Sequence, residues 1–358
     1  MPTDLAFDDR KLTTLPDFSG AIRIEQAGRE VYRGSFGLAN RAWQVHNDQE
    51  TRFRVASISK MFTAVAVLRL VEQGQFGLGD RIGTMLDLSG TTLPAEVTVE
   101  QLLTMTSGIA DWFDESGDWE KNWAELIRRQ PIYLLRRHED YLPLFAHEPP
   151  LSAPGERYSY NGAGYLLLGM LIERITGDTY FDHIRRHVFE PAGMHGAGFV
   201  ALDDVEPHIA EGYLPPTDAD GAVTGWKRNI YSTTPEGAAD GGATCTTADL
   251  IAFNRALRGG LLLGQELTSR MLTPQVKQQD ERTRGYTWKY SYGVMFILDD
   301  HDTVVRWGHT GEEDGVSARL YHYPGLDVDV AILGNHSWCA GKLAWEIHDS
   351  LIGAAAPA

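Results

Sequence analysis

The sequence predicts an α/β protein of the α+β type, with an antiparallel sheet built from both chain ends, flanking helices and a mostly helical insert. Apolar and polar residues alternate over Ala21–Gln26, which is typical of a strand, and after a turn at Gly28 we expect a second strand over Glu30–Leu38 that forms a hairpin with the first. The same period of two returns between Tyr292 and Leu333. Helix-like stretches fill the region between about residues 98 and 259. Strands at both ends around a helical middle predict one sheet that the two termini assemble together.

The individual elements are placed by their periodicity and by the turn residues between them. Strands near the C-terminus are expected over Tyr292–Leu298, Thr303–Trp307, Val316–Tyr323 and Leu326–Leu333. Helices are expected over Ser57–Gln73, Val99–Thr104, Tyr165–Thr176, Thr247–Leu257 and Gly341–Leu351. The first of these helices is apolar on nearly all sides, which predicts a central, buried helix. We expect one domain over residues 1–358, with a discontinuous sheet subdomain (about 1–75 and 235–358) and a helical subdomain (about 76–234).

Composition excludes several classes of partner. The chain has 32 basic and 49 acidic residues and a net charge of −17, so it repels nucleic acids and anionic membrane surfaces. No apolar stretch approaches the roughly 20 residues that a membrane span needs. Two cysteines, Cys245 and Cys339, make neither a disulfide framework nor a zinc ribbon. The N-terminal segment has early acids and no apolar core of a signal peptide, so we expect a cytoplasmic protein. Oligomeric state cannot be inferred from these features.

Ser57 and Lys60 stand three residues apart at the start of the predicted buried helix. Positions i and i+3 share one helix face, so the serine hydroxyl and the lysine amine can approach hydrogen-bond distance. A serine needs an adjacent base to act as a nucleophile, and burial among the flanking apolar side chains disfavours the charged form of a lysine. A helix N-terminus also favours negative charge that develops beside it. The spacing fits a helix cap followed by a solvated lysine as well, so this segment alone leaves both interpretations open.

Further segments point to one family. With Ser57 and Lys60, the sequence resembles the serine β-lactamase and penicillin-recognising superfamily, in the branch of class C β-lactamases, DD-carboxypeptidases, D-aminopeptidases and esterases. The S-x-x-K motif is matched by Ser57 and Lys60, the tyrosine motif by Tyr160, and the K-T-G motif by His309, Thr310 and Gly311. Supporting segments are Leu102–Gly108, the pair Gly241–Gly242, and Gly164–Tyr165 followed by Leu-Leu-Leu-Gly. The matches run in family order from about residue 20 to 335, which is nearly the whole chain.

The resemblance implies a β-lactamase/transpeptidase-like fold and an acyl-enzyme hydrolase that needs no cofactor. Ser57 would attack the carbonyl of a small ester or amide, and Lys60 and Tyr160 would serve as general base and acid. The backbone N–H groups of Ser57 and Glu312 would form the oxyanion hole. We expect the pKa of a phenol beside a cationic lysine to be lowered, which would make it a workable base.

Two departures from the family pattern concern the tyrosine segment. Gly162 stands where the family usually has an asparagine, and Asn161, one position earlier, either replaces it or does not. Tyr158 is the alternative candidate for the catalytic phenol, because the residues Tyr158-Ser159-Tyr160 also lead to Asn161. We prefer Tyr160, because its spacing to Gly164–Tyr165 fits the family.

The third departure concerns charge. His309 replaces a lysine, and we expect a loop of acids, Glu312–Asp314, directly after it. A β-lactam carries a carboxylate that this environment would repel, so the sequence favours neutral or amine-bearing substrates. We expect His309, Thr310, Gly311, Asn161, Trp112 and Glu312 to bind the substrate. The aromatic residues between Trp112 and Tyr141 are either a lid over an acyl pocket or ordinary core.

Other candidate residues are assigned no chemistry. His183 and His187 have the i, i+4 spacing of a metal pair, but they lack the glutamate of the metalloprotease motif, and no third ligand is evident in the sequence. We therefore expect no metal, and we interpret Cys245 as a small buried thiol. Competing interpretations of the whole chain are a β-lactamase or DD-carboxypeptidase, and a non-catalytic ligand-binding module that keeps the pocket.

Overall fold

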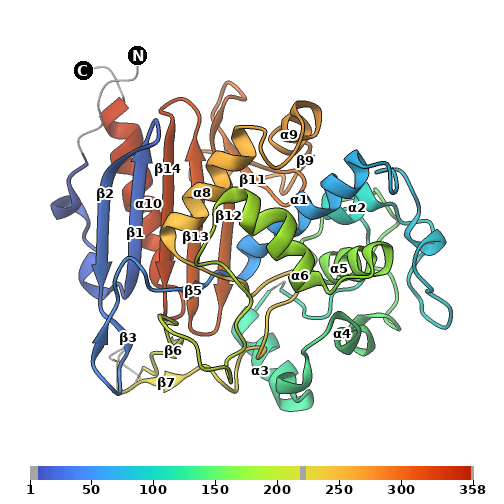
Figure 1. Cartoon of the computed structure of the whole chain (residues 1–358), viewed down its shortest axis with the longest axis horizontal. Helices are drawn as coiled ribbons and strands as arrows, with labels where there is room; N and C mark the ends of the chain where they lie inside the picture. Colours follow the sequence, from blue (N-terminus) through green and yellow to red (C-terminus); the bar gives the residue numbers. More distant parts are fainter. Residues whose placement is uncertain (1–6, 116, 218–222, 356–358) are drawn as a thin grey trace.

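The fold is built around a large antiparallel sheet (Figure 1). The structure, a computed structural model, describes residues 7–115, 117–217 and 223–355. In these residues eight strands pair in the order β2-β1-β14-β13-β12-β11-β10-β9. Their bounds are β1 (Gly20–Gln26), β2 (Arg29–Phe36), β9 (Val276–Lys277), β10 (Thr287–Tyr290), β11 (Met295–Leu298), β12 (Val304–Glu313), β13 (Val316–Tyr323) and β14 (Val328–Gly334). Short strands outside this sheet are β3 (Leu38–Asn40), β4 (Val45–His46), β5 (Phe53–Arg54), β6 (Tyr213–Leu214), β7 (Lys227–Arg228) and β8 (Thr244–Cys245).

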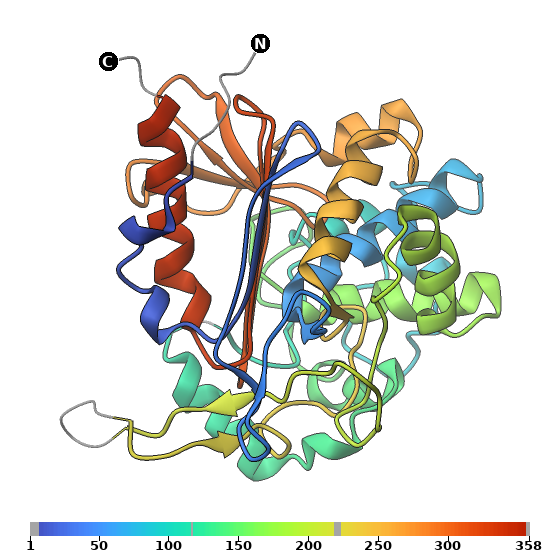
Figure 2. The same cartoon turned by 60° about the vertical axis from the view of Figure 1, so that its left-hand side comes forward.

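The N-terminal and C-terminal parts of the chain meet inside this sheet, because β1 pairs with β14 along its whole length. Ile22 lies opposite Ile332, and this register directs both side chains to the same face. That face is covered by α10 (Cys339–Ala355), and Leu343 and Ile347 pack there against the isoleucines. The opposite face is covered by α8 (Thr247–Arg258) and by the rest of the protein (Figure 2). Since β13 and β14 are covered on both faces, they are buried at every position.

Helix α1 (Ser59–Glu72) lies between the sheet and a helical region (Figure 1). Phe62 of α1 packs edge-on against Phe189 and Phe253, whose ring centroids lie 5.1 and 4.8 Å away. The helical region contains α2 (Val99–Leu103), α3 (Trp119–Arg129), α4 (His138–Phe145), α5 (Gly162–Thr176), α6 (Tyr180–Ile184) and α7 (Glu190–Ala192). Helix α9 (Gln265–Met271) follows α8 in the chain. Burial of α1 on nearly all sides agrees with its apolar sequence.

The predicted fold class is confirmed, and two predicted strands are wrong in their bounds. The strand expected to end at Trp307 continues as β12 to Glu313, so His309–Gly311 lies inside a strand. The expected Tyr292–Leu298 strand begins only at Met295. Gly293 has a φ of +69° and turns the chain there, so the residues before it form the separate strand β10.

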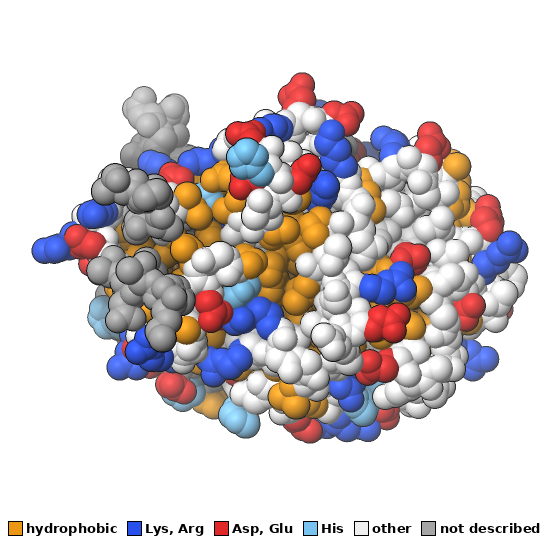
Figure 3. Space-filling view, turned by 90° about the horizontal axis from the view of Figure 1, so that it is seen from above, with side chains coloured by type: hydrophobic (Ala, Val, Ile, Leu, Met, Phe, Trp, Pro, Cys, Tyr) orange, Lys and Arg blue, Asp and Glu red, His pale blue; other side chains and the backbone are white. Residues whose placement is uncertain are grey.

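The surface of the molecule carries charges of both signs. Figure 3 shows acidic and basic side chains interspersed around a group of hydrophobic side chains on the face at the top of Figure 1. Among the residues that the structure describes, no helix is long and apolar enough to cross a membrane.

Candidate active site

Ser57 lies in a 3₁₀ turn (Ala56–Ile58) that connects β5 to α1. Ala56 has a φ of +46°, a conformation that residues with a side chain rarely adopt. Two hydrogen bonds hold this turn. The Val55 N–H donates to the Ala243 carbonyl (2.8 Å), and the Ser59 hydroxyl donates to the Ala56 carbonyl (2.8 Å). Ser57 is thereby placed at the N-terminal end of α1.

The Lys60 amine is buried beside Ser57. Its Nζ donates to Ser57 Oγ at 3.0 Å and to the Asp240 carbonyl oxygen at 2.6 Å. Lys60 is 1% exposed, so its amine does not point into bulk solvent. The i, i+3 spacing therefore places the two side chains as predicted, whereas the carbonyl group comes from a loop 180 residues away.

Tyr160 reaches the same serine from the loop before α5. Its phenol is hydrogen-bonded to the Ser57 side chain, and Lys60 Nζ lies 5.0 Å from its ring centroid. Tyr158, the alternative phenol, packs against the ring of Tyr290 at 5.6 Å. The expected lowering of the phenol pKa is wrong: burial, and then the charge of Glu115, raise the pKa of Tyr160 well above its usual value. The phenol is therefore protonated at neutral pH.

The residues that follow Tyr160 cap helix α5. Asn161 Oδ1 accepts from the Gly164 N–H (2.7 Å), and its Nδ2 donates to the Ile109 carbonyl (3.0 Å). Both polar atoms of this buried amide are thus used inside the protein, as expected for a helix N-cap. The first N–H groups of α5, those of Gly162 and Ala163, donate to the Asp111 carboxylate at 2.8 Å. Burial raises the pKa of Asp111 to about 6.

The space beside Gly162 is filled by two other side chains. A Cβ atom at this position would lie 2.7 Å from Asp240 Oδ2 and 2.7 Å from Trp112 Nε1. These two atoms are themselves hydrogen-bonded at 2.9 Å. An acid and an indole therefore occupy the place next to Lys60 where the family's asparagine side chain would project.

Strand β12 carries His309, Thr310 and Gly311 past the serine. A Cβ on Gly311 would lie 2.1 Å from the Val55 carbonyl oxygen, so only glycine allows the strand to approach the Ser57 turn. His309 is fully buried, with Nε2 3.2 Å from the Tyr290 hydroxyl and Nδ1 2.6 Å from the Thr310 carbonyl oxygen. Burial lowers the pKa of His309 to about 3, so this side chain is neutral at neutral pH. The Thr310 hydroxyl points to the Met295 sulfur, 3.8 Å away.

Glu312 and Glu313 lie in a strand and are paired with cations, which corrects the expectation of an acidic loop over Glu312–Asp314 for these two residues. Glu312 and Glu313 are still in β12; Glu312 forms an ion pair with Arg319, and Glu313 lies 3.3 Å from Arg54. The side chains are only 16% and 20% exposed. Three further carboxyl groups near Ser57, those of Asp111, Glu115 and Asp240, were not placed in the site by sequence reasoning, and burial raises the pKa of each, that of Glu115 to about 7.

A narrow cavity of about 60 Å³ opens at Ser57 and Lys60. Four aromatic side chains line it together with acids on both sides: Trp112, Phe113, Trp119, Trp123, Glu115, Asp240, Glu312 and Glu313. The other aromatic residues of this segment are not in the lining, since Tyr141 is 2% exposed in the core and Tyr133 is 55% exposed on the surface. The aromatic segment thus divides between pocket wall, core and surface.

Comparison with known protein families finds a match over most of the chain. The family model described as "Beta-lactamase" matches residues 9–337. The chain belongs to the beta-lactamase family.

The relatives of this chain are named as penicillin-binding proteins and as an esterase. The chain is 30% identical over 259 residues to a putative penicillin-binding protein, PbpX, of Bacillus subtilis (72% of this chain, 59% of that protein). It is 31% identical over 206 residues to the esterase EstB of Burkholderia gladioli (56% and 50%). The crystal structure of a penicillin-binding protein from Bacillus halodurans superposes with a TM-score of 0.85 at 35% identity, covering 94% of this chain and 98% of that one. The chain thus spans between half and two thirds of the length of the two curated relatives.

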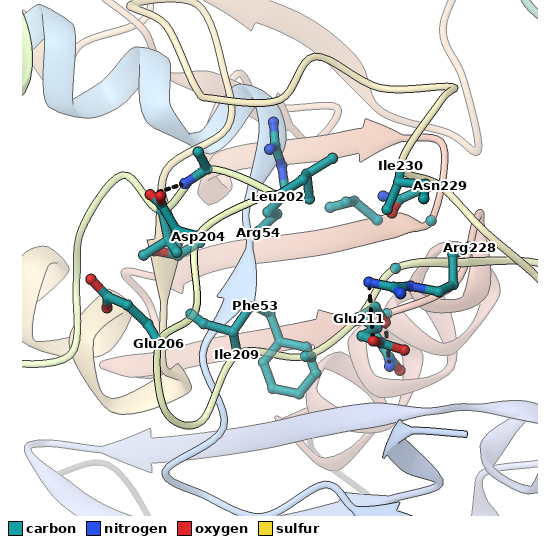
Figure 4. A pocket seen from close by; sticks show the side chains of 18 of the residues that line it. Phe53, Arg54, Leu202, Asp204, Glu206, Ile209, Glu211, Arg228, Asn229 and Ile230 are labelled. Carbon is teal, nitrogen blue, oxygen red and sulfur yellow. Dashed lines mark hydrogen bonds and ion pairs between the residues drawn. The ribbon is translucent and has the colours of Figure 1, made fainter. Parts of the chain in front are cut away.

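A larger cavity of about 420 Å³ lies beyond Arg54 (Figure 4). Phe53, Leu202 and Ile209 form an apolar wall, and Asp204 and Glu206 lie on the side opposite the Arg228–Glu211 ion pair. This cavity is not lined by Ser57 or Lys60. Arg54 lines this larger cavity and pairs with Glu313, which lines the serine cavity. Cavity size alone therefore does not point to Ser57.

Proposed function

We propose that this protein is a serine hydrolase that cleaves a small ester or amide through an acyl-enzyme on Ser57. The observation that carries the proposal is the convergence on Ser57 Oγ of the Lys60 amine, at 3.0 Å, and the Tyr160 phenol. A serine with an adjacent base and a second proton-carrying group is the arrangement that nucleophilic catalysis requires. The esterase name of EstB, a family member at 31% identity, supports ester cleavage.

The three groups are assigned separate proton roles. Because the pKa of Tyr160 is raised by burial, its phenol carries a proton at neutral pH and is suited to donate it to the leaving group. The Lys60 amine takes the proton of Ser57 as the serine oxygen attacks the carbonyl. In the second half of the reaction, water attacks the carbonyl of the acyl-enzyme and gives a proton to the Tyr160 oxygen. Lys60 returns its proton to the Ser57 oxygen as the acid leaves, so all three groups regain their starting state.

The oxyanion hole is assigned to the backbone N–H groups of Ser57 and Glu312. In the described residues β11 pairs with β12 only as far as Gly308, so β12 has an edge without a strand partner from His309 onward. Gly311 brings this part of β12 against Val55 and Ala56. Each preorganised donor of this kind contributes about 3–4 kcal/mol to transition-state stabilisation.

The charges around Ser57 favour a neutral or amine-bearing substrate. Carboxyl groups outnumber cations among the described residues here, with Asp111, Glu115, Asp240, Glu312 and Glu313 around Lys60, Arg54 and Arg319. Neutral His309 stands where the family has a lysine, so the positive charge that would bind a substrate carboxylate is missing. A protonated amine gains from the same acids and from the aromatic wall.

A labelling and turnover experiment tests the function. Purified protein is treated with a fluorophosphonate and measured by intact mass, and p-nitrophenyl esters are assayed beside D- and L-aminoacyl p-nitroanilides and nitrocefin. We expect one covalent adduct, absent in Ser57→Ala and retained in Ser159→Ala, and turnover of esters or aminoacyl anilides. Ser159 is a suitable control because it lies in the same loop as Tyr160 and donates only its backbone N–H, to the Met105 carbonyl.

Two other results would replace this proposal. Efficient nitrocefin turnover without esterase or aminoacyl anilide activity would identify a β-lactamase or DD-carboxypeptidase, as the names of the penicillin-binding relatives would suggest. A stable acyl adduct that is never released would identify a ligand-binding module.

A further inference from the structure

A second group of chemically active side chains lies where α5 ends and α6 begins. Gly177, with a φ of +73°, ends α5, and the Thr179 side chain caps α6, so Asp178 occupies the corner between the helices. His183 and His187 follow on the next turns of the chain. One ligand atom from each of Asp178, His183 and His187 lies within 4.8 Å of the other two.

The two imidazoles share one face because they stand four residues apart. Helix α6 ends at Ile184 and continues as a π-helical turn over Arg185–Phe189, a feature that often marks functional sites. The ring centroids of His183 and His187 are 4.4 Å apart. The sequence spacing already predicts that these two rings lie on one side of the helix. The Asp178 carboxylate lies near them only because the chain turns between α5 and α6.

His183 is the observation that points to a ligand. Its side chain is 5% exposed, and neither ring nitrogen has a hydrogen-bond partner among the described residues. The nearest approach, Nδ1 to Asp178 Oδ2, is 4.0 Å, which is too long for a hydrogen bond. Leaving a buried polar group without a hydrogen-bond partner costs about 1–3 kcal/mol. The ring nitrogens of His183 are therefore suited to bind a ligand that is not part of the protein.

Space for a ligand and its water molecules lies directly beside these groups. A cavity of about 200 Å³ is lined by the three residues and by the C-terminal part of α1, including Arg69 and Gln73. Arg186 donates to both oxygens of Asp178, at 3.1 and 3.2 Å, and so fixes the carboxylate. Arg69 and Arg186 are positive, and they weaken the binding of a cation without occupying the imidazole nitrogens.

We propose that Asp178, His183 and His187 form a binding site for a divalent transition-metal ion of the Zn²⁺ type. Two imidazoles and one carboxylate are a ligand set that Zn²⁺ accepts, with water completing the coordination. The site lies near the C-terminal end of α1, roughly 18 Å along that helix from Ser57 at 1.5 Å per residue. The metal therefore joins α5 and α6 across the corner and takes no part in the chemistry proposed for Ser57.

The test is a metal titration of the full-length protein after chelator treatment. Zn²⁺ is titrated by calorimetry, Co²⁺ is used to read coordination by visible absorption, and thermal unfolding is followed with and without Zn²⁺. We expect one equivalent to bind and to raise Tm. His187→Gln and Asp178→Asn should each weaken Zn²⁺ binding at least tenfold, whereas His195→Gln, which changes an exposed histidine outside the site, should alter it less than twofold.

A gain-of-binding variant keeps the test independent of misfolding. Arg69→Gln removes a competing positive charge, so it should tighten Zn²⁺ binding several-fold. The proposal is overturned if the wild-type protein binds no stoichiometric Zn²⁺, or if His187→Gln and Asp178→Asn bind it as the wild type does. Ester turnover by the chelator-treated protein tests the hydrolase alone, so failure of the metal site and failure of the proposed hydrolase are separately visible.

Discussion

Placing the family's asparagine back at position 162 should damage this protein. The new Cβ would lie 2.7 Å from both Asp240 Oδ2 and Trp112 Nε1, so it would separate two groups that are now hydrogen-bonded at 2.9 Å. A hydrogen bond to a charged group contributes about 1.5–3 kcal/mol, and forcing extra atoms into a packed site costs about 1–3 kcal/mol. For Gly162→Asn we therefore expect a loss of about 3–5 kcal/mol in the free energy of unfolding.

The assay is urea unfolding followed by circular dichroism, with p-nitrophenyl ester turnover measured on the same samples. Asp240→Ala removes the obstructing carboxylate, so the double variant Gly162→Asn/Asp240→Ala should be more stable than the sum of the two single effects predicts, by at least about 1.5 kcal/mol. The reasoning is refuted if Gly162→Asn unfolds at the wild-type urea concentration, or if the two substitutions are additive.

Three further predictions concern the same cavity. Tyr160→Phe should lower kcat for p-nitrophenyl esters by about 10²–10⁴, whereas Tyr158→Phe should change it less than threefold; the reverse order would move the acid role to Tyr158. His309→Lys restores a positive charge, so the ratio of kcat/KM for carboxylate-bearing to amine-bearing esters should rise at least tenfold, and an unchanged ratio would contradict the charge argument. Because the pKa of His309 is lowered to about 3 in the fold and is about 6.5 when unfolded, its stabilising contribution is complete above pH 6.5 and is lost as the pH falls toward 3. From His309 alone we expect a loss of about 2 kcal/mol between pH 7 and pH 5, seen as a lower urea midpoint, and the same pH dependence in His309→Gln would show that another group is responsible.

The sequence by itself determined the local geometry of its helices and strands. The apposition of Ser57 and Lys60 follows from one turn of helix, and the alternation in Ala21–Gln26 follows from the two-residue repeat of a strand. The family motifs also predicted that residues far apart in the chain lie close together, because each motif has a known position in the fold of the family. Fold class and family could therefore be inferred from the order of residues alone.

Only the tertiary structure decided the electrostatics of the site and the partners of its charged groups. Asp240 lies beside Lys60 across 180 residues of chain, and Arg54 meets Glu313 across an even longer separation, so no local pattern reveals either contact. The direction of the Tyr160 pKa shift depends on burial, which outweighs the lysine charge that the sequence suggested. Asp178 approaches His183 and His187 because Gly177 ends α5 and the chain turns a corner into α6. Solvation and long-range contacts are properties of the folded chain. Folding places these groups in an environment of low dielectric constant, and this burial shifts their pKa values.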